Sequence, residues 1–180
     1  LLQAGVAFGQ GTTNAFDEAV WLVLWRLGLP LDGDLDAEGG RLVAADEQQQ
    51  VSALIDQRIA TRQPAAYLTR EAWLQGVSFY VDERVIIPRS FIAELLADGS
   101  IDPWLSEDTQ RVLDLCTGNG SLALLTAMTY PDVQVDAADI SVDAHRCRYN
   151  ALVEQDAYDL PVFSPCDDIH PCTQERGDYH

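Results

Sequence analysis

The sequence predicts an α/β fold, in which a parallel βαβ unit follows a small helical domain and a β-hairpin. Val112, Leu113 and Leu115 make a short apolar run that is typical of a buried strand. A glycine turn interrupts it, and residues 121–129 resume with helical character. Nineteen residues past Gly120, a second strand-like run ends in Asp139. An acid about 20 residues beyond the glycines is the position from which a βαβ unit binds ribose hydroxyls. The unit therefore indicates a nucleoside-cofactor site.

Two amphipathic helices are predicted in the first part of the chain. Asn14 can cap the first, which runs to about Leu27 and ends at Gly28. The second extends over residues 46–62, and Pro64 prevents its continuation. Both place apolar side chains on one stripe, as helices packed around a core do.

A β-hairpin is predicted after these helices, over residues 77–87 with its turn at Asp82 and Glu83. Pro88 ends it, and Ser90 can cap a further helix. The predicted domains are a helical domain at residues 1–76, a hairpin linker at 77–89 and a cofactor domain that begins at 90 and includes residue 180.

Beyond Asp139, residues 141–155 are predicted to be helical and residues 160–163 to form a third strand. Asp167 and Asp168 follow that strand, where a carboxylate can accept from the exocyclic amine of a nucleobase. The alternative for either acid is a solvated loop carboxylate.

The glycines alone do not identify the cofactor. Gly118, Gly120 and Ala123 also satisfy the looser dinucleotide fingerprint, which leaves NAD open. Asp114, four residues before Gly118, would repel a pyrophosphate but suits an ammonium group. A phosphate-binding P-loop is excluded, because the chain has no lysine.

The chain carries a net charge of −18, from 29 acidic and 11 basic residues. Such a charge disfavours direct binding to nucleic-acid backbones and attracts a basic partner. The alternative is that it serves solubility or adaptation to salt. No segment has the apolar run needed to cross a membrane.

The four cysteines show no CxxC pair, which favours reduced thiols and a cytoplasmic protein. A cluster near residue 180 fits no standard zinc spacing, and we expect no metal site. Its members are Cys166, His170, Cys172 and His180.

Several motifs together resemble the family of methyltransferases that modify the side-chain amide nitrogen of protein glutamines. They are Gln63–Thr69 (QPAAYLT), Phe79–Ser90 (FYVDERVIIPRS), Asp114–Gly120 (DLCTGNG) and Asp139–Ser141 (DIS). The release-factor branch of this family usually follows Pro-Arg with Pro-Glu-Thr-Glu. The run Ser90–Glu94 (SFIAE) is instead similar to the branch that acts on large-subunit ribosomal protein three, as is Gly9–Glu18.

The resemblance implies a Rossmann-like methyltransferase domain, C-terminally truncated in this chain, with S-adenosyl-L-methionine as the cofactor and the ribosomal protein as the substrate. It implies that the glycine loop wraps the methionine part, that Asp139 holds the ribose and that two later acids lie near the adenine. The expected cofactor residues are Asp114, Cys116, Thr117, Gly118, Asn119, Gly120, Ser121, Asp139, Ile140, Asp167 and Asp168.

No catalytic residue is predicted within the chain. The family's catalytic element is an Asn-Pro-Pro-Tyr tetrapeptide that holds the glutamine amide, and we expect it beyond His180, because the sequence contains no such element. Two function classes therefore stay open. The chain is either the cofactor-binding part of an enzyme, with a peptide-release factor as the alternative substrate, or a non-catalytic cofactor- or protein-binding fragment.

Overall fold

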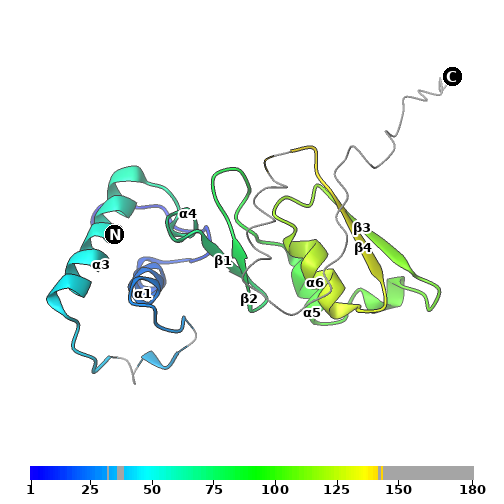
Figure 1. The fold of residues 1–180 in the computed structure, drawn as a ribbon, viewed down its shortest axis with the longest axis horizontal. Helices are drawn as coiled ribbons and strands as arrows, with labels where there is room; N and C mark the ends of the chain where they lie inside the picture. Colours follow the sequence, from blue (N-terminus) through cyan, green and yellow to red (C-terminus); the bar gives the residue numbers. More distant parts are fainter. Residues whose placement is uncertain (32, 36–38, 142, 144–180) are drawn as a thin grey trace. The chain divides into compact units, whose positions relative to one another are not determined.

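The computed structural model describes residues 1–31, 33–35, 39–141 and 143, and these divide into two compact units. The first unit is Leu1–Glu71, and the second begins at Ala72. Figure 1 shows helices dominating the first unit and a small parallel sheet in the second. None of the described helices combines the length and the apolar character needed to span a bilayer. The domain boundaries predicted from the sequence, after residues 76 and 89, stay predictions.

The helical unit contains α1 (Ala15–Arg26), α3 (Ala45–Thr61) and the short α4 (Ala65–Thr69). The side chain of Asn14 caps α1 by accepting from the backbone N–H of Phe16 at 3.0 Å, as its sequence position predicts. Both predicted amphipathic helices are thus confirmed. The short α4 was not predicted, because five residues after a proline carry no helical periodicity.

A buried ion pair joins the two long helices of this unit. Arg58 Nε donates to Glu18 Oε1 at 2.9 Å, and each side chain is about 2% exposed. Arg58 also donates to the carbonyl of Ala7 at 2.9 Å, so the pair ties the N-terminal segment to α1 and α3. Removing one partner would leave a buried charge unpaired, which costs about 3–5 kcal/mol in proteins.

The hairpin lies earlier in the chain than predicted. Its strands are β1 (Glu71–Leu74) and β2 (Val77–Tyr80). Gln75 (φ 49°) and Gly76 (φ 76°) form the left-handed two-residue turn that fits the twist of paired strands. The prediction of a hairpin over 77–87 is therefore wrong. A turn does begin at Asp82, but residues 81–87 contain no strand.

The parallel βαβ unit is confirmed. Strands β3 (Arg111–Leu115) and β4 (Gln134–Ala138) pair in parallel, with Asp114 opposite Ala137. Helix α6 (Ser121–Thr129) connects them and begins at the predicted residue. The predicted strand at 160–163 lies outside the described residues. Of the helix predicted at 141–155, only residues 141 and 143 are described.

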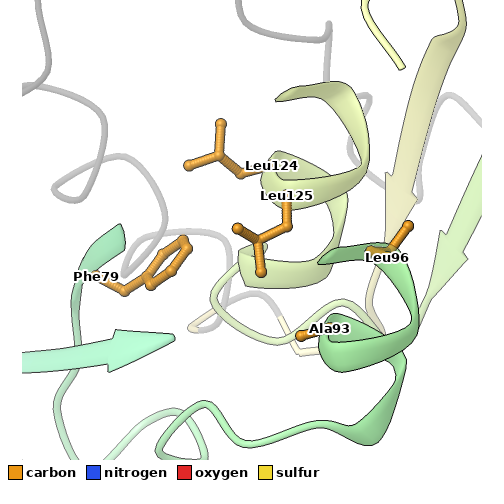
Figure 2. Close-up of a cluster of buried hydrophobic side chains, with 5 residues drawn as sticks. All are labelled: Phe79, Ala93, Leu96, Leu124 and Leu125. Carbon is orange, nitrogen blue, oxygen red and sulfur yellow. The ribbon is translucent and has the colours of Figure 1, made fainter. Parts of the chain in front are cut away.

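One apolar cluster joins the hairpin to the helices of the second unit. Helix α5 (Phe91–Ala97), capped by Ser90, and η1 (Asp102–Trp104) precede β3. Figure 2 shows side chains of β2, α5 and α6 meeting in this cluster, and a second cluster packs α6 on β4. The first cluster contains Phe79, Ala93, Leu96, Leu124 and Leu125.

Candidate functional site

A cavity of about 490 Å³ lies at the carboxyl ends of β3 and β4. The edge of a parallel sheet at which the strands end is where α/β proteins bind their ligands. Seven predicted cofactor residues line this cavity, while Gly120 and Ile140 do not and Asp167 and Asp168 lie outside the described residues. The seven are Asp114, Cys116, Thr117, Gly118, Asn119, Ser121 and Asp139.

The loop between β3 and α6 turns through three residues in the left-handed region. Cys116 has φ 62°, Gly118 has φ 57° and Gly120 has φ 82°. A Cβ atom added at Gly118 would meet no heavy atom within 4 Å, so the cavity reaches the backbone there. The same φ at Cys116 is unfavourable for a residue with a side chain. The loop is therefore held in a strained conformation beside the cavity.

Asp114 is anchored to the fold through one of its two carboxylate oxygens. Oδ2 accepts from Thr117 Oγ1 at 2.5 Å and from the backbone N–H of Ala123 at 3.1 Å, near the start of α6. Oδ1 has no hydrogen bond to any described residue. The anchored oxygen fixes the carboxylate, and Asp114 is one of the residues that line the cavity.

Burial raises the pKa of Asp114 above 3.8, although the Thr117 and Ala123 hydrogen bonds act in the opposite direction. The nearby Asp139 carboxylate raises it further by repulsion. A cation that bound in the cavity would offset both effects by stabilising the ionised form. The electrostatics of this wall therefore favour a positively charged ligand group.

Asp139 braces the glycine loop from the end of β4. Its Oδ2 accepts from the backbone N–H of Gly118 at 2.8 Å, and its Oδ1 accepts from that of Ser141 at 2.8 Å. Each carboxylate oxygen can accept more than one hydrogen bond, so ribose hydroxyls can also bind here. The predicted ribose residue thus has a structural contact that the sequence did not reveal.

The segment that follows the hairpin forms a cavity wall that sequence reasoning missed. Arg84 and Arg89 line the same cavity as the two acids. Arg84 is oriented by the buried carboxylate of Asp82, which accepts from Arg84 Nε at 2.9 Å and from Arg84 Nη2. The sequence predicts residues 82–87 as the turn and second strand of a hairpin, and therefore does not predict the pairing of Asp82 with Arg84. The spacing of an acid and an arginine around a tight turn was the available signal.

The cavity therefore combines acids from the strand ends with arginines from the other segment. Such polarity suits a zwitterionic group, which carries an ammonium and a carboxylate together. Among the described residues, no group of three or more His, Cys, Asp and Glu side chains is arranged to hold a metal ion. The cysteine and histidine cluster considered for zinc lies outside that part of the chain.

Comparison with curated proteins gives high similarity over most of the chain. A Burkholderia pseudomallei protein is 53% identical over 161 residues, which cover 88% of this chain and 50% of the relative. A Neisseria gonorrhoeae protein is 52% identical over 144 residues, with 79% and 48% covered. A Bordetella pertussis protein is 54% identical over 146 residues, with 78% and 47% covered.

All three relatives are named ribosomal protein uL3 glutamine methyltransferase. The chain spans about half the length of the curated relatives that it matches. No family model matches the chain.

Proposed function

We propose that the protein to which this chain belongs is a methyltransferase with the specificity of the ribosomal protein uL3 glutamine methyltransferases. The support is the similarity of this chain to about half the length of those relatives. The methyl donor is S-adenosyl-L-methionine, and the acceptor is the side-chain amide nitrogen of a glutamine in uL3. The described residues that line the cavity form part of the donor site. Residue Asp114 and its surroundings carry this proposal.

The split role of Asp114 supports an amino-acid cofactor in preference to a dinucleotide. Its Oδ1 accepts no hydrogen bond from a described residue and belongs to a wall whose charge favours a cation. The ammonium group of the methionine part supplies such a cation. A pyrophosphate would instead be repelled by Asp114 and Asp139, and this disfavours NAD.

The other residues take roles that follow from their geometry. Gly118 lets the cofactor lie against the backbone, since no Cβ intervenes, and Asp139 holds the ribose hydroxyls while it braces the loop. Arg89, and Arg84 with its ion-pair partner Asp82, lie on the segment that follows the hairpin, and we propose that their guanidinium groups donate to the methionine carboxylate. We also propose that Asp167 and Asp168 contact the adenine.

When bound, S-adenosyl-L-methionine supplies an activated methyl group for in-line transfer to a nitrogen. The contribution of these residues is positioning, because a fixed donor and acceptor geometry lowers the barrier without acid–base chemistry. We assign no catalytic residue to the chain, which contains no Asn-Pro-Pro-Tyr.

The acceptor assignment has a supporting observation of its own. A net charge of −18 favours association with a basic protein such as a ribosomal protein that is not yet bound to RNA. Charge mainly raises the association rate, and salt screens it beyond about 8 Å at physiological ionic strength.

Titration calorimetry of the 180-residue chain with S-adenosylhomocysteine and with NAD tests the donor site. We expect the methionine-derived ligand to bind and NAD to bind far more weakly. NAD binding of equal strength would reject the methyltransferase proposal.

A further inference from the structure

Four large apolar side chains are exposed on α5 and on the segment that precedes it. Their exposed fractions are 78% for Ile86, 83% for Phe91, 51% for Ile92 and 43% for Leu95. Ile86 and Ile92 also line the cavity itself. These four residues are called the apolar rim below. Exposed apolar residues are ordinary singly, but a neighbouring group of them indicates a binding surface.

The outward orientation of the rim is fixed by the other side of α5. Ala93 and Leu96 are buried in the cluster around Phe79, at 1% and 4% exposure (Figure 2). Ser90 Oγ accepts from the backbone N–H of Ile92 at 3.1 Å and sets where the helix begins. Phe91 and Leu95 are four residues apart and therefore share a stripe that faces away from this cluster. Phe91 and Leu95 are therefore not part of the apolar cluster around Phe79.

The same stripe carries negative charge. Glu94 and Asp98 follow Phe91 by three and seven residues, so both lie on its side of the helix. Hydrogen bonds from Ser100 lower the pKa of Asp98, a carboxylate whose ordinary pKa already leaves it ionised at neutral pH. The residues of α5 include no basic side chain. The α5 part of the rim is thus apolar with acidic neighbours, while Ile86 lies between Arg84 and Arg89 in the sequence.

We propose that the apolar rim is a docking surface for the acceptor protein, on which a segment with apolar and basic side chains lies next to the target glutamine. The proposal rests on the function proposed above, and adds the surface that binds the acceptor. A segment seated on Ile86 and Ile92 passes the mouth of the cavity, because both residues belong to its wall. A basic acceptor complements Glu94 and Asp98. A second copy of this chain, with its net charge of −18, matches these acids less well than a basic protein does.

The test compares Phe91→Ser and the double variant Phe91→Ser, Leu95→Ser with the parent chain. Trp104→Ser is the matched control, since Trp104 is 86% exposed and does not line the cavity. Each chain is titrated with purified RNA-free uL3 and with S-adenosylhomocysteine, and its thermal unfolding is recorded. We expect Phe91→Ser to weaken uL3 binding about tenfold, as an interface anchor does, and the double variant to weaken it further. The rim variants should keep the parent's affinity for S-adenosylhomocysteine and its melting temperature. Trp104→Ser should match the parent in all three measurements.

The possible failures are distinguishable. If the parent binds both ligands and the rim variants bind uL3 as tightly as the parent does, the docking surface is refuted while the proposed function stands. The same holds if the nucleoside binds and uL3 does not. If the parent binds neither ligand, the proposed function fails and this inference fails with it. Loss of self-association alone in the variants would assign the rim to a second copy and overturn the proposal.

Discussion

The carboxylate of Asp139 accepts a hydrogen bond from the backbone N–H of Gly118 at 2.8 Å, which connects the end of β4 to the loop that follows β3. The sequence placed this acid where a ribose would bind, but not against the loop. Substitution of Asp139 should therefore affect both cofactor binding and the stability of the cofactor-free chain.

Asp139→Ala is expected to weaken S-adenosylhomocysteine binding by about 1.5–3 kcal/mol, the range for hydrogen bonds to a charged group. It should also lower the melting temperature of the free chain, because Gly118 and Ser141 lose their acceptor. Calorimetry and thermal denaturation measure the two effects. An unchanged dissociation constant would mean that the ribose is bound elsewhere.

Asp114→Asn should separate binding from stability. The amide oxygen can still accept from Thr117 and Ala123, so the start of α6 keeps its anchor. The charge that we propose binds the ammonium group is lost, and we expect affinity for S-adenosylhomocysteine to fall at least about tenfold, which corresponds to one charge-assisted hydrogen bond. The melting temperature should not fall at neutral pH. A large loss of stability would show that the ionised carboxylate holds the fold together.

The pH dependence of this variant follows from the raised pKa of Asp114. A folded-state pKa above the unfolded value of 3.8 means that protonation favours the folded state. The stability contribution of Asp114 is therefore fully present below pH 3.8 and is lost as the pH rises through the folded pKa. Urea unfolding on both sides of that interval should show Asp114→Asn gaining relative stability at the higher pH. A relative gain at the lower pH would reverse the sign and contradict the assignment.

Gly118→Ala has a matched control in Gly5→Ala. Both glycines have left-handed φ values, 57° and 61°, and an added Cβ meets no atom within 4 Å at either. Each variant should lose about 1 kcal/mol of stability from backbone strain. Only the Gly118 variant places its methyl group in the cavity wall, so only it should weaken nucleoside binding. Equal affinities for the two variants would place the cofactor away from the loop.

The sheet of the described chain leaves apolar side chains uncovered. Leu113 and Leu115 of β3 are 56% and 70% exposed, and within the described residues β3 pairs with β4 alone. Parallel sheets are stable when both faces are covered, and an open apolar edge invites association. We expect the chain to self-associate with rising concentration in sedimentation velocity, and Leu113→Asp to reduce this. A concentration-independent monomer would contradict the expectation.

Local signals in the sequence predicted the βαβ part of the second unit. The apolar run before Gly118, the helical stretch from Ser121 and the acid after the second strand gave β3, α6 and β4 nearly at their observed limits. Asn14 and Ser90 marked two helix starts by their capping chemistry. In each case the residues that decide the structure are neighbours in the chain.

The features that were missed depend on less common local chemistry or on contacts between distant segments. Gln75 was not read as a turn residue, because a left-handed φ is unusual for glutamine, and the hairpin was placed too late. The wall that contains Arg84 exists because its segment returns to the strand ends. The periodicity of apolar residues does not predict that this segment packs near the strand ends.

Methyl transfer in a competition between uL3 and a peptide-release factor tests the central claim most directly. The enzyme is a fusion of this chain with the part of the Burkholderia pseudomallei relative that the chain does not cover, and the 180-residue chain alone is the control. With tritiated S-adenosyl-L-methionine and both substrates at equal concentration, we predict label on uL3, located on a glutamine by mass spectrometry, and none from the chain alone. Preferential labelling of the release factor, or no transfer by the fusion, would contradict the proposed function.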